Sequence, residues 1–184
     1  NSKIYSHDKL NSLDKTTCPE LSMFQDFIYP PLLDKLVTYI TTEKLNWSAE
    51  QYQESKNRVK LNWVANSVIE EVHMVFDSLT DQIDNLYNKQ TKFMGISIWK
   101  DAEGYTIRPH TDQSLISVSM QVYLTESAVD LSTKFLVNGK VLHPEYRKNS
   151  GYIQNNVVGI THFMNTPVPA DHDRYSLYAI WTDS

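Results

Sequence analysis

The sequence GYTIRPHTDQSLISVSMQVYL, residues 104–124, decides the fold. On both sides of its centre, polar and apolar residues alternate, and alternation with a period of two predicts β-strands. His110 and Asp112 lie between the two alternating runs, at a strand end or in the turn that leaves it. Two ligand-type side chains on so short a piece of backbone can hold one face of a divalent metal ion. We therefore expect a third ligand and an anion clamp elsewhere in the chain.

Alternation continues on both sides of this stretch and predicts a β-rich C-terminal half. An Asn-Gly pair at Asn138-Gly139 predicts a hairpin between two short apolar runs. The expected strand segments are FMGISIWK (93–100), FLVNGKVL (135–142), GYIQNNVVGITHFM (151–164, one or two strands) and RYSLYAIW (174–181). A turn is expected at 101–104.

The N-terminal half instead carries the three-and-four spacing of amphipathic helices. One helix is expected from about Pro31 to Thr42. Residues 1–22 are expected to form an arm or a short strand, and residues 43–56 are expected to form a loop. A longer apolar stripe runs from Leu61 to Leu86, which predicts one helix or two broken near Asp77-Ser78, with Asn57 as the N-cap. Helices followed by many short strands favour an antiparallel barrel or two-sheet sandwich buttressed by helices.

Composition restricts the class of protein. With 184 residues, 41% of them hydrophobic, the chain is long enough for one sizeable core and is expected to be a single domain. A net charge of −5 does not favour nucleic acid as the partner. Its single cysteine, Cys18, cannot form an intrachain disulfide. Because neither a long apolar run nor a signal-peptide core is present, we expect a cytoplasmic protein without a membrane span.

Four histidines beyond the first twenty residues are candidates for the third ligand. His73 lies beside the buried stripe of a helix, His143 is in a loop before Pro144, and His172 is in a polar turn, so each has an ordinary structural explanation. His162 lies in the apolar segment VVGITHFM, where a strand can pair beside the one that carries His110. A histidine in such a strand is more often a hydrogen-bonded core residue than a ligand.

The last strand strengthens the case for His162. Arg174, Ser176 and Tyr178 alternate along it and so share one face. An inward-facing guanidinium is costly without an anionic partner, and a carboxylate ligand held by Arg174 and Ser176 would remove that cost. The alternative is that Arg174 faces solvent or pairs with Asp171 or Asp173.

Taken together, His110-x-Asp112, His162 and Arg174-x-Ser176 resemble the motif of the Fe(II)- and 2-oxoglutarate-dependent oxygenases. The resemblance covers about residues 93–181. Gly104, Pro109 and the pair Tyr123-Leu124 match the prolyl 4-hydroxylase-like branch. Two features depart from it: Trp99 replaces a tyrosine common in relatives, and LSTKF (131–135) replaces a Gly-Gly-x-x-Phe. The last strand also lacks the paired arginines of the nucleic-acid demethylase branch.

This resemblance implies a mainly β fold, a double-stranded β-helix (jelly roll) with helical support in 1–90 and the core in 91–184. It implies Fe(II), 2-oxoglutarate and O2 as cofactors, with His110, Asp112 and His162 as catalytic metal ligands. Arg174, Ser176 and Tyr123 are the expected 2-oxoglutarate contacts. The implied reaction hydroxylates a small molecule or a peptide, such as a prolyl residue, and releases succinate and CO2.

Two other classes fit the same sequence. A cupin-like barrel that binds a metal or a sugar would need the metal ligands but not an anion clamp. A non-catalytic relative that serves as an interaction domain would need neither. Binding of 2-oxoglutarate separates both from an oxygenase.

Overall fold

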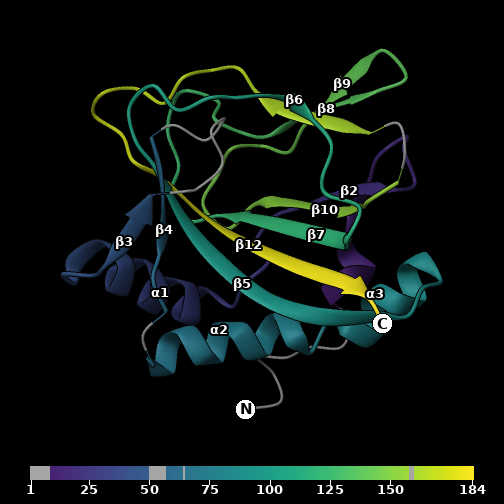
Figure 1. Ribbon diagram of the computed structural model, residues 1–184, viewed down its shortest axis with the longest axis horizontal. Helices are drawn as coiled ribbons and strands as arrows, with labels where there is room; N and C mark the ends of the chain where they lie inside the picture. Colours follow the sequence, from purple (N-terminus) through teal and green to yellow (C-terminus); the bar gives the residue numbers. More distant parts are fainter. Residues whose placement is uncertain (1–8, 50–56, 64, 158–159) are drawn as a thin grey trace.

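The computed structural model describes residues 9–49, 57–63, 65–157 and 160–184, and in them two antiparallel sheets face each other (Figure 1). The larger sheet has the strand order β1-β2-β10-β7-β12-β5-β4-β3, and the smaller one has the order β6-β11-β8-β9. The strands are β1 (Asp14–Lys15), β2 (Leu21–Phe24), β3 (Trp47–Ala49), β4 (Arg58–Leu61), β5 (Thr91–Asp101), β6 (Ile107–His110), β7 (Ile116–Tyr123), β8 (Lys134–Val137), β9 (Lys140–Leu142), β10 (Gly151–Asn155), β11 (Thr161–Met164) and β12 (Arg174–Asp183). The helices are η1 (Lys9–Ser12), α1 (Pro30–Thr42), α2 (Ser67–Asp77) and α3 (Thr80–Tyr87).

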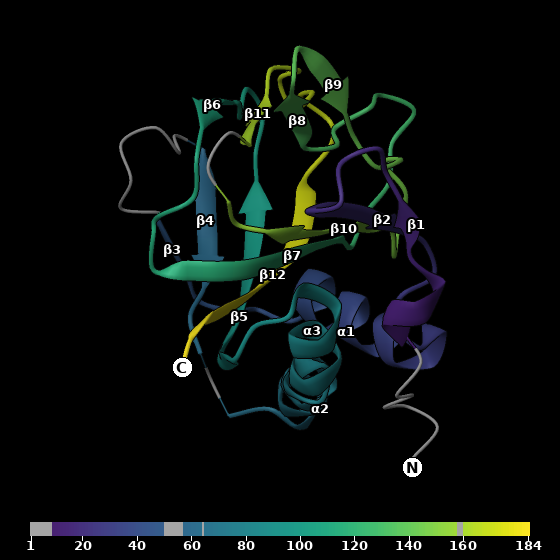
Figure 2. The ribbon, with the colours of Figure 1, turned by 90° about the vertical axis from the view of Figure 1, so that its right-hand side faces the viewer.

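Helices α1, α2 and α3 lie on one side of the larger sheet and the smaller sheet lies on the other (Figure 2). The side chains between sheet and helices are apolar and buried, and include Leu36, Phe76, Met120, Leu177 and Trp181. Because neighbouring residues of a strand point to opposite faces, the alternate positions face the smaller sheet. Those positions on the central strands are polar and buried: Ser119 and Gln121 on β7, Gln154 on β10, and Arg174 and Ser176 on β12. The polar face of the sheet is therefore where chemistry can occur.

The predicted strands, the hairpin and the first helix are confirmed. Pro30 and Pro31 open α1, whose buried face carries Leu32, Leu33, Leu36 and Ile40. Asn138 and Gly139 have φ of 50° and 76°, as a tight hairpin between β8 and β9 requires. The break near Asp77-Ser78 separates α2 from α3. The double-stranded β-helix buttressed by helices is thus the observed architecture.

Two predictions about the segment 43–66 are wrong. The second helix begins at Ser67, because the Asn66 side chain accepts hydrogen bonds from the backbone of Val68 and Ile69. Asn57 is not an N-cap: it has a positive φ of 67° and precedes β4, in which Leu61 lies. The expected loop 43–56 contains β3, and its residues 50–56 lie outside the described residues, as do 1–8 of the expected arm.

Gly151 marks a place where two central strands of the larger sheet come very close. A Cβ built on Gly151 would lie 1.8 Å from the carbonyl oxygen of Gln121 on β7. We expect Gly151→Ala to force β10 and β7 apart and to lower the free energy of unfolding by about 1–3 kcal/mol, as overpacking does. Urea unfolding of the variant and the wild type measures this difference. Equal midpoints and slopes would contradict the close approach.

Candidate active site

The three predicted metal ligands meet between the two sheets. His110 ends β6, Asp112 follows two residues later, and His162 lies directly opposite His110 on the neighbouring strand β11. One ligand atom from each of the three residues lies within 4.8 Å of the other two. His162 Nε2 is 3.3 Å from Asp112 Oδ1, and the two imidazole rings are 4.1 Å apart between centroids. The sequence prediction that His162 would pair beside the His-x-Asp strand is confirmed.

This donor set suits a first-row divalent metal such as Fe(II). Two imidazoles and one carboxylate on a single face form the facial triad of non-haem iron sites. Adjacent corners of an octahedron with bonds of about 2.1 Å are about 3 Å apart, close to the observed nitrogen-to-oxygen separation. His110 Nδ1 lies 2.8 Å from the carbonyl oxygen of Arg108. When Nδ1 donates this hydrogen bond, Nε2 presents its lone pair to an ion, as ligating histidines commonly do.

Asp112 is held in place and kept ionised by its neighbours. The hydroxyls of Ser119 and Tyr178 both donate to Oδ2, each at 3.4 Å. Burial would raise the pKa of Asp112, but His162, His110 and Ser119 together outweigh burial and lower it. The residue thus presents a carboxylate, the form that a metal ion requires.

Arg174 is buried on the polar face of β12, where its relative exposure is 1%. Its Nη1 donates to Asp101 Oδ2 at 2.8 Å and its Nε donates to the carbonyl oxygen of Leu131 at 2.8 Å. A longer bond of 3.4 Å joins Nη2 to the hydroxyl of Thr133. The alternative of a solvent-facing Arg174, or one paired with Asp171 or Asp173, is therefore wrong. Contacts with described residues engage three of its five N–H donors.

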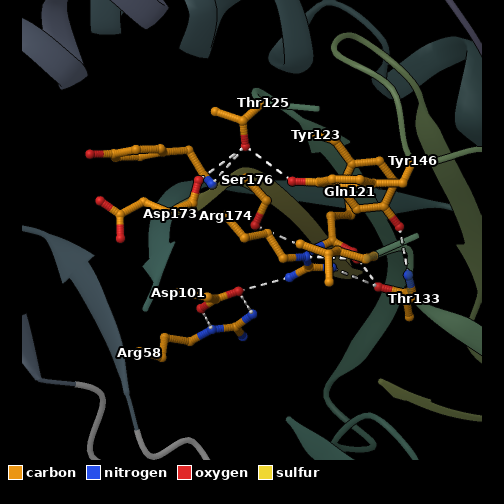
Figure 3. A network of polar contacts seen from close by, with 12 residues as sticks. Arg58, Asp101, Gln121, Tyr123, Thr125, Thr133, Tyr146, Asp173, Arg174 and Ser176 are labelled. Atoms are coloured by element: carbon orange, nitrogen blue, oxygen red, sulfur yellow. Dashed lines mark hydrogen bonds and ion pairs between the residues drawn. The ribbon is translucent and has the colours of Figure 1, made fainter. Parts of the chain in front are cut away.

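Asp101 has a second cationic partner, Arg58 on β4 (Figure 3). Arg58 donates to the two carboxylate oxygens of Asp101 at 2.6 and 3.0 Å. Arg58, Asp101 and Arg174, here called the Arg-Asp-Arg cluster, thus combine two positive charges with one negative charge. Burial is the largest single influence and would lower the pKa of both arginines. The charge and hydrogen bonds of Asp101, together with nearby tyrosines, outweigh burial and raise the pKa, so both arginines stay charged. The cluster has a net charge of +1 in a buried place.

The groups around Arg174 leave hydrogen-bond donors, and not acceptors, for a ligand. Tyr123 accepts a bond from the backbone N–H of Thr133 at 2.8 Å, which leaves its own O–H to donate. Ser176 accepts from Gln121 Nε2 at 3.2 Å, and Gln121 in turn accepts from the hydroxyl of Thr133 at 2.6 Å. Figure 3 shows these side chains gathered beside Arg174. A donor-rich place with a net positive charge suits a carboxylate.

One face of β12 connects the Arg-Asp-Arg cluster with the three predicted metal ligands. Tyr178 lies two residues beyond Ser176 on the same face of β12, and its hydroxyl reaches Asp112. The Tyr178 ring stacks on Trp99 of β5, with the ring centroids 4.7 Å apart. Arg174, Ser176 and Tyr178 thus form a row that ends at Asp112.

Sequence reasoning missed three residues of this site, Arg58, Asp101 and Thr133. Arg58 was missed because the segment that contains it was predicted to be the start of a helix. Asp101 was assigned to a turn, yet it is the last residue of β5 and shares the strand face of Trp99. The two-residue spacing between Trp99 and Asp101 could have predicted that both lie on the same face of this strand. Thr133 lies in LSTKF, where the chain departs from the family pattern and no periodicity locates its contacts.

The other candidate histidines lie apart from the triad: His73 of α2 packs on Phe93, and His143 and His172 have hydrogen-bonding partners of their own. His172 Nε2 is 3.0 Å from the hydroxyl of Tyr146, and His143 Nδ1 is 3.3 Å from the hydroxyl of Ser132. Burial raises the pKa of Tyr146 to about 12, so Tyr146 remains a neutral hydrogen-bonding partner. None of these histidines is in the group that could hold a metal.

Asp130 organises the loop that carries Leu131 and Thr133. Partial burial would raise its pKa, but hydrogen bonds from Lys134 and Ser132 lower it to about 2, below the usual 3.8. A lowered pKa in the folded state stabilises the fold above pH 4, and this contribution is lost as the pH falls from about 4 to 2. Because its side chain is 47% exposed, the contribution is at most about 1 kcal/mol.

We therefore expect Asp130→Asn to unfold with a shallower pH dependence than the wild type between pH 4 and 2. Urea unfolding at several pH values measures both slopes. Parallel curves for the two proteins would show that Asp130 does not have this role.

Comparison with solved structures places this geometry in a known fold. A prolyl hydroxylase from Trichoplax adhaerens, in complex with a peptide fragment of the oxygen degradation domain of hypoxia inducible factor, is similar with a TM-score of 0.73 and 13% identity over 99% of this chain and 89% of that one. A Pseudomonas putida prolyl-4-hydroxylase has a TM-score of 0.68 and 16% identity, with 96% of each chain covered. HygX from Streptomyces hygroscopicus, with nickel and 2-oxoglutarate bound, has a TM-score of 0.70 and 10% identity over 97% of this chain and 87% of that one.

The chain has the fold of the Fe(II)- and 2-oxoglutarate-dependent oxygenases. The likeness extends over nearly the whole chain, so the helices as well as the jelly roll belong to the shared fold. No family model matches the sequence, and no curated protein matches it either. The resemblance drawn from the motif residues is confirmed at the level of this oxygenase fold.

Among the described residues, no helix is long and apolar enough to cross a membrane.

Proposed function

We propose that the protein is an Fe(II)- and 2-oxoglutarate-dependent dioxygenase that hydroxylates its substrate. The observation that carries this proposal is the convergence of His110, Asp112 and His162 within 4.8 Å, inside the fold of such oxygenases. When bound, Fe(II) together with 2-oxoglutarate supplies O2-dependent oxidation of a C–H bond, coupled to release of succinate and CO2. The protein's own residues bind, orient and shield these reactants.

In this proposal Arg174, Ser176 and Tyr123 hold the distal carboxylate of 2-oxoglutarate. Two N–H groups of Arg174 that no described residue engages, and the hydroxyl protons of Ser176 and Tyr123, would donate to this anion, and hydrogen bonds to a charged group are strong. Ser119 and Tyr178 fix the orientation of the Asp112 carboxylate, and the carbonyl of Arg108 fixes the ring of His110. The stacked rings of Trp99 and Tyr178 help to exclude water from the space between the two sites.

The donor set favours this function over a cupin-like metal-binding or sugar-binding barrel. Such a barrel would use the metal ligands but would gain nothing from a buried cluster with a net positive charge, because burying that charge without an anion is costly. The same argument applies to a non-catalytic interaction domain. An anionic co-substrate is the simplest partner for the cluster.

We propose a prolyl residue in a peptide or protein as the substrate, and a small molecule as the alternative. Two of the similar structures are prolyl hydroxylases, and one of them is in complex with a peptide. HygX is also solved with hygromycin B bound, which keeps the small-molecule class open. Succinate formation stimulated by proline-containing peptides, compared with the same peptides carrying alanine, distinguishes the two classes.

An anaerobic titration tests the proposed function. Fe(II) and 2-oxoglutarate added to the protein are expected to produce the weak visible metal-to-ligand charge-transfer band. Succinate should then form when O2 and a substrate are supplied. A protein that binds a divalent metal but not 2-oxoglutarate would instead belong to the cupin-like class.

A further inference from the structure

We propose that Arg58 gives the co-substrate pocket its positive charge and thereby makes the protein select a 2-oxo acid with a distal carboxylate. This inference rests on the proposed function, because it concerns the site where 2-oxoglutarate would bind. Arg58 comes from β4, in the N-terminal half of the chain, so the residue that sets the charge lies outside the jelly-roll core that carries the other pocket residues. In this role Arg58 is a positioning residue and does not touch the ligand.

Three neighbouring strands bring the Arg-Asp-Arg cluster into one row. Arg58 on β4 and Arg174 on β12 are both backbone partners of Asp101 on β5, which lies between them. Because cross-strand partners place their side chains on the same face, the three charged groups lie next to one another. The relative exposures of their side chains are 8%, 0% and 1% for Arg58, Asp101 and Arg174. Water therefore screens the three charges only weakly.

Asp101 by itself would cancel the charge of Arg174. The two groups are 2.8 Å apart and fully buried, so together they form a neutral pair with little attraction for a carboxylate. Arg58 neutralises Asp101 from the opposite side through two hydrogen bonds. As a result, Asp101 no longer cancels the positive charge of Arg174, and this charge can attract a ligand.

The surroundings of Arg58 fix it in this role. Its guanidinium carbon lies 4.0 Å from the ring centre of Trp99 and 4.4 Å from that of Tyr105. Stacking on aromatic faces and a bidentate carboxylate are contacts that arginine makes better than lysine. Stability alone gives little reason for such a cluster, because well-packed apolar residues are often as stabilising as a buried ion pair.

Charge-changing variants of the cluster test the inference by ligand binding, without turnover. Calorimetry on Mn(II)-loaded protein measures the Kd for 2-oxoglutarate and for 2-oxobutyrate, which lacks the distal carboxylate. We expect R58Q, whose cluster is neutral, to weaken 2-oxoglutarate binding on the order of 10-fold while the Kd of 2-oxobutyrate stays unchanged. The double variant R58Q/D101N restores the net charge of +1 and should recover most of the lost affinity.

Two further variants separate charge from structure. R58K loses the bidentate fork but keeps the positive charge. Because the inference depends on the charge, the 2-oxoglutarate affinity of R58K should stay within about 3-fold of the wild type. K100Q removes an equal charge from a partly exposed residue on the same strand as Asp101 and should leave both Kd values unchanged. Thermal unfolding verifies that every variant is folded under the conditions of measurement.

The outcomes distinguish this inference from the proposed function. If the wild type does not bind 2-oxoglutarate, the proposed function fails. If the wild type binds it but R58Q binds it equally well, or if R58K loses as much affinity as R58Q, Arg58 is only a structural residue and the inference is overturned. Failure of the double variant to recover affinity would overturn it as well.

Discussion

Substitution of Asp112 by alanine is expected to abolish turnover and to weaken Fe(II) binding by more than about 100-fold. Asp112 supplies the only anionic oxygen among the three converging ligand groups, and His162 Nε2 lies 3.3 Å from it. Without the carboxylate, a divalent ion would meet two neutral imidazoles. Calorimetric titration with Mn(II) or anaerobic Fe(II) measures the metal affinity, and succinate formation measures turnover.

His110→Ala and His162→Ala should have the same effect, because each removes one of the two imidazoles of the triad. Matched controls are His143→Ala and His172→Ala, which remove histidines that contact Ser132 and Tyr146 instead. These controls should retain metal binding and turnover. If His172→Ala abolished turnover while His162→Ala did not, the assignment of the third ligand would be wrong.

The meeting of His110, Asp112 and His162 could be predicted from the sequence because its signal is largely local. Period-two alternation defines the strand that ends at His110, and two residues further along is Asp112. His162 needed only the inference that a later apolar strand would pair with this one, which it does with His110 as its partner. Short spacing and strand periodicity are properties of the sequence itself.

The partners of Arg174 could not be predicted in the same way, because they depend on strand order and register. Asp101 and Arg58 are far from Arg174 in the sequence and become its neighbours only when β4, β5 and β12 pair side by side. Sequence reasoning weighed Asp171 and Asp173 because they are close in the chain. The prediction of a helix that includes Arg58 and Leu61 was also wrong. It arose because the apolar spacing continues from the end of β4 into α2.

The predicted metal ligands and the Arg-Asp-Arg cluster come together in different ways. His110 and Asp112 are only two residues apart, so the chain itself brings them together, whereas the Arg-Asp-Arg cluster exists only after strands from both halves of the chain have paired. Loss of Asp101 would leave two buried guanidinium groups without their shared counter-ion, a change that typically costs about 3–5 kcal/mol of stability. The Arg-Asp-Arg cluster therefore depends on strand pairing in the larger sheet, as the meeting of His162 with His110 depends on strand pairing in the smaller one.

Replacement of Arg174 by methionine is expected to weaken 2-oxoglutarate binding by about 3 kcal/mol, or roughly 100-fold. The variant removes the positive charge and the two N–H donors that are not engaged by described residues, while Tyr123 and Ser176 keep their hydroxyls. Its fold should survive, because Asp101 keeps the bidentate partner Arg58 and a methionine fills a similar volume. Calorimetry on Mn(II)-loaded protein measures the affinity, and thermal unfolding reports the fold.

The matched control for this prediction is Arg147→Met. Arg147 lies at the surface with 67% of its side chain exposed, so the same chemical change there should leave the Kd for 2-oxoglutarate unaltered. Metal affinity should be normal in both variants, because the triad does not contact Arg174. An Arg174→Met variant that is folded, binds Mn(II) and retains the wild-type Kd for 2-oxoglutarate would show that the distal carboxylate binds elsewhere. If Arg174 contacts 2-oxoglutarate directly and Arg58 acts only through Asp101, Arg174→Met should lose much more affinity than R58Q.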